Sequence, residues 1–185
     1  LFFKGKESDG WYQTGLNIIE KELLEQVLTD GGNFELSPMY HSIFLLDLLD
    51  LVNIHHAYNK KQISGVKDKI PLMLYWLQSM CHPDGGISFF NDAAFGVAPS
   101  LDELLDYAKK LSIKNISEKV KTLEYLKDSG YIRVERENLV AMLDVANIGP
   151  DYIPGHGHAD VLSFELSLFG KRVIVNSGTS IYGIS

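Results

Sequence analysis

The spacing of apolar residues changes near residue 128, and that change limits the folds this chain can adopt. Before it, apolar side chains recur every three or four residues, as in residues 16–28, which is the spacing of one helix face. After it, residues 131–136 alternate between two sets of side chains, and residues 139–145 continue as an apolar run, as strands do. Helices followed by strands predict an α+β fold in two parts, with residues 1–128 helical and residues 129–185 antiparallel β.

Local signals place the individual elements. Ser37 followed by Pro38 predicts the start of a largely apolar helix over residues 39–55, because Ser caps helix N-termini and Pro suits the first helical position. Ser100 is expected to cap another helix over residues 101–111. The other expected helices are residues 16–28, 67–80 and a weaker stretch at 117–126; the expected strands are residues 131–136, 139–145, 162–169 and 172–175.

Charge and composition argue against nucleic acid and a membrane as partners. The formal net charge is −7 and arginine occurs only at positions 133, 136 and 172, so no basic stripe is available for nucleic acid. The longest apolar runs are too short, or too interrupted by acidic residues, for membrane insertion. An acidic protein still binds an acidic sugar where the local charge of the site allows it, so net charge does not identify the substrate.

The ends of the chain and its cysteine content add little about location. Cys81 is the only cysteine, so an intrachain disulfide is excluded. The chain shows no signal peptide and begins at Leu1 rather than Met, and we expect it to be a fragment of a longer protein.

The segment Gly155-His156-Gly157-His158-Ala159-Asp160 has the character of a functional site. Two imidazoles two residues apart share one face of an extended segment, and the flanking glycines permit close approach of backbone and substrate. The alternative is that both histidines simply bind loop carbonyls. A second polar group gathers where the helix at 39–55 begins, with Glu35, Tyr40 and His41; there the alternative is a packing tyrosine and surface polar residues.

Three segments, in this order, resemble the heparinase II/III-like family of polysaccharide lyases. They are Gly-Gly-Asn-Phe-Glu-Leu-Ser-Pro-Met-Tyr-His at 31–41, His-Pro-Asp-Gly at 82–85 with Phe-Asn-Asp at 90–92, and Pro-Gly-His-Gly-His-Ala-Asp at 154–160 with Ser-Phe-Glu at 163–165. The resemblance implies the end of an incomplete (α/α) toroid of helical hairpins followed by the start of an antiparallel β-sandwich. It also implies β-elimination on a uronic-acid-containing, glycosaminoglycan or alginate-like polysaccharide, in a periplasmic or secreted protein.

The resemblance also suggests roles for single residues. Tyr40 corresponds to the family's catalytic acid, and possible base, and His156 to the histidine that completes the site across the junction. Glu35, His41 and Asn91 are expected to bind substrate. The group that neutralises the uronate carboxylate is expected upstream of Leu1, and Asn33 is not assigned that role.

A structural zinc ion is the one cofactor that the resemblance raises, and none is required for the elimination itself. Its expected ligands here are His158 and the residue at position 176, which is Asn176 where a family member has Asp. A hydrogen-bonded His158 partnered by Asp160 is the alternative.

Two other functions stay open at this stage. The chain is compatible with a non-catalytic glycan-binding or surface-polysaccharide assembly protein of the same fold, or with a metal hydrolase built on the His-x-His pair. The partner expected for a lyase and for a glycan-binding protein is an acidic polysaccharide, and the oligomeric state is not predicted.

Overall fold

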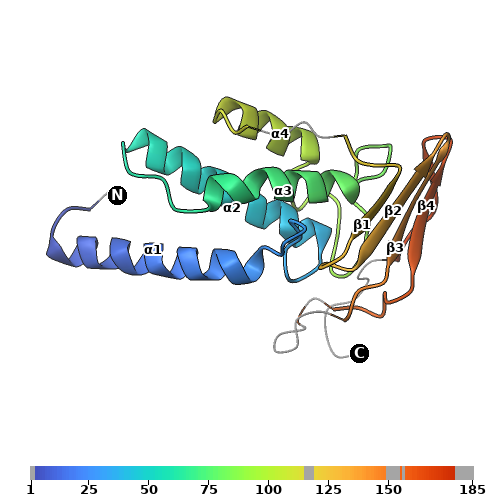
Figure 1. Ribbon diagram of the computed structural model, residues 1–185, viewed down its shortest axis with the longest axis horizontal. Helices are drawn as coiled ribbons and strands as arrows, with labels where there is room; N and C mark the ends of the chain where they lie inside the picture. The colour runs from blue at the N-terminus through green and yellow to red at the C-terminus, as the bar shows by residue number, and fades with distance from the viewer. Residues whose placement is uncertain (1–2, 115–118, 149–154, 156, 178–185) are drawn as a thin grey trace.

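The chain forms four helices followed by a five-stranded antiparallel sheet, within residues 3–114, 119–148, 155 and 157–177, which are those that this computed structural model describes (Figure 1). The helices are α1 (Lys6–Gln26), α2 (Pro38–Ala57), α3 (Val66–Ser79) and α4 (Leu101–Lys110). The strands are β1 (Leu123–Leu126), β2 (Tyr131–Arg136), β3 (Leu139–Asp144), β4 (Phe164–Leu168) and β5 (Lys171–Ile174). The α+β fold class is confirmed.

The helix starts follow the capping signals. The Ser37 hydroxyl accepts a hydrogen bond from the Tyr40 N–H and so caps α2. Ser100 and Glu103 form a reciprocal capping box at the start of α4. α1 instead begins at Lys6, well before residue 16, because the apolar stripe that predicted it covers only its second half.

The helical core lies between α2, α3 and α4. Leu45, Leu48 and Leu49 of α2 are fully buried against these neighbours, as its nearly all-round apolar surface requires. α1 runs alongside, and Leu23 is its one buried residue. Figure 1 shows that α1 ends and α2 begins at the end of the helical layer nearest the sheet, so the loop between them lies at the junction.

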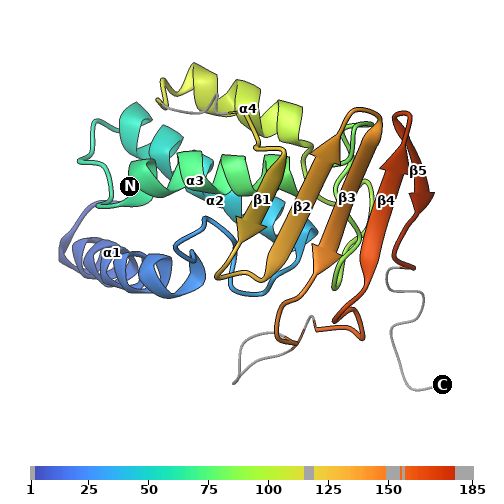
Figure 2. The ribbon, with the colours of Figure 1, turned by 45° about the vertical axis from the view of Figure 1, so that its right-hand side comes forward.

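The five strands follow one another in the sheet in the order β1-β2-β3-β4-β5 (Figure 2). The weak helix expected at 117–126 is wrong for its described residues, because residues 123–126 form β1 and pair with β2 in the register Leu123↔Val134. Pairing with a neighbouring strand has outweighed a weak local helical pattern. The sheet thus includes residues that the division at 128 had assigned to the helical part, and that division itself stays a prediction.

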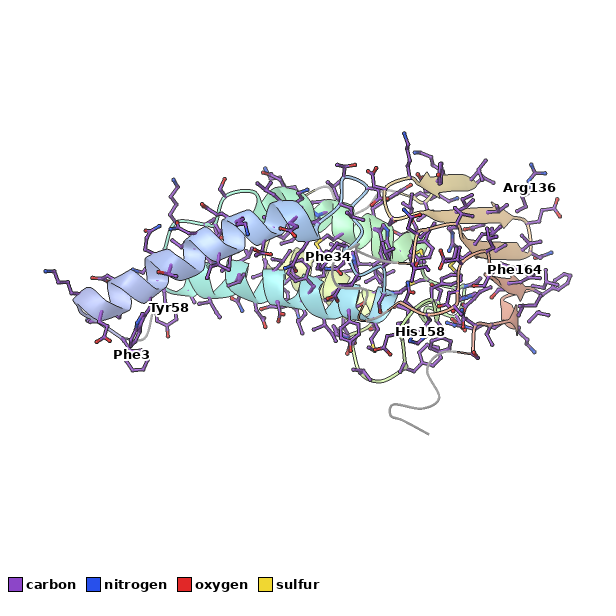
Figure 3. The ribbon with its side chains drawn as sticks, turned by 90° about the horizontal axis from the view of Figure 1, so that it is seen from below. Phe3, Phe34, Tyr58, Arg136, His158 and Phe164 are labelled. Carbon is purple, nitrogen blue, oxygen red and sulfur yellow. The ribbon has the colours of Figure 1, made fainter. Side chains whose placement is uncertain are left out.

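The two faces of the sheet differ sharply in polarity. The helices cover one face (Figures 1 and 2), and the buried side chains pointing that way include Glu124, Arg133, Asp144, Glu165 and Ser167. The opposite face, on which Figure 3 labels Phe164, is apolar apart from Arg136 and Lys171. Its side chains are Leu123, Tyr125, Ile132, Val134, Leu139, Ala141, Leu143, Phe164, Leu166, Leu168 and Ile174. Polar contacts therefore join the helices to the sheet.

Candidate active site

Tyr40 stands in the first turn of α2, at the end of that helix nearest the sheet. The Ser37 hydroxyl that accepts from the Tyr40 N–H also donates to the main-chain oxygen of Asp92, at 2.7 Å. Segment 91–92 is therefore bound directly to the helix start that carries Tyr40. The side chain of Tyr40 is half-buried.

The Tyr40 hydroxyl donates a hydrogen bond to the carboxylate of Asp92. Burial raises the pKa of Tyr40 above its usual value of 10.0, and the negative charges of Asp92 and Glu35 raise it further. At neutral pH the side chain is consequently a protonated phenol with a fixed acceptor, which is the state in which it could donate a proton.

Glu35 belongs to the loop that leads into α2. Its backbone N–H donates to the Asn33 side-chain oxygen at 3.0 Å, and its charge is near enough to raise the pKa of Tyr40. The structure therefore brings Glu35 and Tyr40 together. The side chain of Glu35 is partly exposed. A substrate contact by Glu35 stays a prediction.

His41 lies next to Tyr40 in sequence but points into the protein. It is 0% exposed; its Nδ1 accepts from the Asn33 N–H at 3.2 Å, and its Nε2 is 3.0 Å from the Met73 carbonyl, to which it donates. The ring stacks on Trp76 with centroids 4.4 Å apart. Burial lowers the pKa of His41 to about 3, so the ring is neutral. This geometry conflicts with the expected substrate contact, since a side chain without exposed surface and with both nitrogens bonded has nothing left to offer a ligand.

Asn91 is likewise used within the protein. Its side-chain amide donates to the Leu36 carbonyl at 3.0 Å and to the Tyr131 hydroxyl at 3.1 Å, and its side-chain oxygen accepts from the His158 N–H at 3.3 Å. The residue is 4% exposed. The expectation that Asn91 binds substrate directly is therefore in conflict with its burial, and its contacts join three separate segments instead.

His156 lies outside the described residues, so its predicted catalytic role is neither supported nor opposed by the structure. His158 is described, and Figure 3 places it between the helices and the sheet. The backbone N–H of His158 donates to the side chain of Asn91. The next residue in the chain, Asp92, accepts from the Tyr40 hydroxyl. His158 is thus tied to the Tyr40 side of the junction.

His158 and Asn176, the expected zinc ligands, line one cavity of about 430 Å³ together with Asp160 and Ser163. The Asn176 side-chain amide donates to the Ser163 hydroxyl at 3.5 Å, and an Asp160 carboxylate oxygen accepts from the Asn91 N–H. Over the described ranges, no three His, Cys, Asp or Glu side chains gather as metal ligands would. The two expected ligands, one imidazole and one amide, do not by themselves make a zinc donor set, and zinc binding stays an untested prediction.

His82 and Glu165 form a buried polar pair that was not among the residues expected at the site. Nε2 of His82 is 2.6 Å from the Glu165 carboxylate and Nδ1 is 2.7 Å from the Ser167 hydroxyl, with both partners of the pair fully buried. The other Glu165 oxygen accepts hydrogen bonds from the backbone N–H groups of Phe89 and Asn176. Both residues stand inside segments that carried the family resemblance, and that was the available signal. The pair fastens the loop after α3 to β4.

Comparison with known proteins identifies the family. The model described as "Heparinase II/III N-terminus" matches residues 1–115, and the one described as "Heparinase II/III-like, C-terminal" matches residues 118–184. This chain belongs to the heparinase II/III family. The two family regions meet close to the start of the sheet, between α4 and β1.

Relatives of the chain in this family carry lyase names. It is 26% identical to a heparin-sulfate lyase of Bacteroides stercoris over 201 residues, covering 98% of this chain and 29% of the relative. It is 32% identical to a heparin-sulfate lyase of Pedobacter heparinus over 94 residues, covering 48% of this chain and 14% of the relative. The crystal structure of heparan sulfate lyase HepC from Pedobacter heparinus superposes with a TM-score of 0.72 at 22% identity, covering 97% of this chain and 30% of that one, which shows a shared fold. The chain thus spans less than a third of these heparinase-family proteins.

The expected lack of membrane insertion can be compared with the helices. Within the described part of the chain, no helix has both the length and the apolar content needed to cross a membrane.

Proposed function

We propose that the full-length protein containing this chain cleaves a uronic-acid-containing polysaccharide by β-elimination, with heparan sulfate as the first substrate to test. The observation that carries the proposal is the Tyr40 hydroxyl, bound to a buried carboxylate at the junction of helices and sheet, beside the segment that bears the His-x-His pair. The names of the two curated relatives supply the substrate class.

The reaction assigns clear tasks to an acid and a base. A base removes the proton from C5 of the uronate, the C4–O bond breaks, a C4–C5 double bond forms, and the departing O4 takes up a proton. Electrons balance without an oxidant or reductant, and no water is consumed. A neutralised uronate carboxylate makes the C5 proton more acidic, and no residue of this chain is assigned that task.

Tyr40 suits the acid step. Its raised pKa keeps the phenol protonated at neutral pH, so it begins the cycle with the proton that the leaving oxygen needs. His156 is proposed as the partner that accepts the C5 proton, because a neutral imidazole can act as a base at neutral pH. Alternatively, Tyr40 serves both steps after prior loss of its proton, and the pH dependence of turnover distinguishes the two schemes.

The test uses the full-length protein and follows the ultraviolet absorbance of the conjugated C4–C5 double bond. Heparan sulfate should give product, with alginate as the comparison for a different uronate polymer. Tyr40→Phe removes only the hydroxyl and should lower turnover roughly 10²–10⁴-fold, the usual contribution of general acid–base catalysis. Tyr58→Phe, at the other end of α2 (labelled in Figure 3), is the matched control and should keep full activity. A wild-type protein silent on a broad uronate panel, or an active Tyr40→Phe variant, would refute the proposal.

A non-catalytic glycan-binding protein of the same fold is the second candidate. It is favoured by Asn176, whose amide bonds to Ser163 where the family resemblance led us to expect a metal-binding carboxylate. Heparan sulfate binding that is unchanged by Tyr40→Phe, with no unsaturated product from wild type, would support this candidate over the lyase. Lost turnover with intact binding in the same variant would exclude it.

A further inference from the structure

Asn91 has the backbone and the contacts of a residue that joins segments. Its φ of 57° lies in the left-handed region, which Asn tolerates better than most residues. Its side chain bonds to Leu36, which precedes α2, to Tyr131 in β2 and to the backbone of His158. Its backbone N–H donates to the Asp160 carboxylate, so two contacts fix segment 158–160 to this one residue. The helical part, the sheet and segment 158–160 all meet at Asn91.

Asp92 connects the same point to Tyr40. Its main-chain oxygen accepts from the Ser37 hydroxyl at 2.7 Å, which holds the start of α2, and its carboxylate accepts from the Tyr40 hydroxyl. Asp92 is 5% exposed, so the carboxylate is not presented to bulk solvent. Consecutive residues therefore hold the phenol on one side and the histidine-bearing segment on the other.

We infer that Asn91 and Asp92 are positioning residues that fix Tyr40 and segment 158–160 relative to each other, rather than residues that contact the polysaccharide. The inference rests on the proposed lyase function. Its physical reason is that reaction between bound groups depends steeply on placement, and a displacement of about 1 Å costs about 100-fold in rate. Two consecutive residues bonded to Tyr40 and to segment 158–160 allow less relative movement between them than two independent loops would.

Two substitutions in the full-length protein separate positioning from substrate contact. Asp92→Ala removes the acceptor of the Tyr40 hydroxyl, and Asp92→Asn restores an acceptor oxygen of the same size without the charge. Asn91→Gly removes the three side-chain bonds while keeping a residue at ease with φ of 57°. We expect Asp92→Ala and Asn91→Gly to lower kcat about 10–100-fold with KM changed by no more than about twofold, and Asp92→Asn to recover part of the loss.

Asp30→Asn is the matched control. The Asp30 carboxylate also bonds across the junction, to the backbone N–H and hydroxyl of Ser129, but no described contact of its side chain involves Tyr40 or Asn91. Like Asp92→Asn, this substitution removes one negative charge and weakens contacts between the helices and the sheet. It should therefore lower the thermal midpoint while leaving kcat unchanged. A KM increase at constant kcat in the Asn91 or Asp92 variants would show substrate contact and overturn the inference.

Two spectroscopic readouts keep the inference testable without activity. The ¹³Cζ resonance of Tyr40, assigned by its absence in Tyr40→Phe, should titrate at lower pH in Asp92→Asn, because one of the two carboxylates that face the phenol, Asp92 and Glu35, has lost its charge. Hydrogen exchange at the His158 amide should accelerate in Asn91→Gly. Inactive wild type would refute the proposed function alone. Unchanged titration and exchange would overturn the positioning role, and the expected shifts would support it.

Discussion

Replacing His41 by Gln should remove a strong pH dependence from the stability of this fold. His41 is fully buried, and its two nitrogens bind the Asn33 N–H and the Met73 carbonyl, which only the neutral ring can do. A Gln amide also offers one donor and one acceptor, but it does not titrate. The substitution therefore changes the proton linkage while retaining both kinds of polar group.

The magnitude follows from the difference between the folded and unfolded pKa. Burial lowers the pKa of His41 from 6.5 to about 3. Protons then bind the unfolded chain more tightly, so the stability contributed by the neutral ring is complete above about pH 6.5 and is lost as the pH falls toward about 3. The limiting slope is about 1.4 kcal/mol per pH unit, so lowering the pH from about 7.5 to about 5 removes about 2 kcal/mol from the free energy of unfolding. That is a large share of the roughly 5–15 kcal/mol typical of a folded domain.

Urea unfolding followed by circular dichroism across this pH range measures the effect. As the pH falls, the free energy of unfolding of wild type should drop by about 2 kcal/mol relative to that of His41→Gln. Only in wild type does unfolding expose an imidazole at position 41 that takes up a proton. His56→Gln, at an exposed position near the end of α2, controls for the loss of an imidazole. Parallel curves for wild type and His41→Gln would show that the buried ring does not titrate as argued.

Three further substitutions test two glycine positions and one buried carboxyl. Gly130→Ala should cost about 2–4 kcal/mol, because φ is 76° and the new Cβ would lie 2.4 Å from the Cα of Ala146; Gly170→Ala, with φ of 77° and nothing within 4 Å, should cost only about 1 kcal/mol in urea unfolding. Burial raises the pKa of the Asp144 carboxyl from 3.8 to about 6, helped by the charge of Asp160, so this carboxyl contributes stability as the pH falls from about 6 to about 4, opposite in sign to the His41 contribution. After allowance for solvent screening the gain is about 1–2 kcal/mol, and Asp144→Asn should lack it in a pH series of thermal midpoints.

Elements fixed by local chemistry were predictable from the sequence. Ser37 with Pro38, and Ser100 with Glu103, satisfy backbone groups within one helical turn, so no distant residue is needed to place the starts of α2 and α4. The alternation in residues 131–136 likewise marked β2. By contrast, β1 depends on pairing with β2, and its four residues hold no strong signal of their own.

The candidate site was predictable in part. The segments that matter were found, because Tyr40, Asn91 and His158 all lie in motifs of the family resemblance. The direction of a side chain was not, since neither spacing nor residue type reveals that His41 turns to the Met73 carbonyl while its neighbour Tyr40 turns to Asp92. Those directions depend on segments 32 to 52 residues away in the chain, which is a tertiary property.

Polar side chains on the inner face of the sheet, set among buried apolar ones such as Met142, fix the arrangement of the junction. Alternation in β2 shows that Arg133 and Val134 face opposite ways, but simple hydrophobic reasoning would have turned Val134 toward the helices. The structure turns Arg133 inward, where its guanidinium donates to the carbonyls of Ser79 and Cys81 at 3.1 and 2.6 Å, at the C-terminal end of α3. Unsatisfied carbonyls at a helix end attract a cation. Directional bonds of this kind fix how the sheet is placed along the helices, which apolar packing alone would leave freer to slide, and the placement of Tyr40 against the segment that begins at Gly157 depends on that.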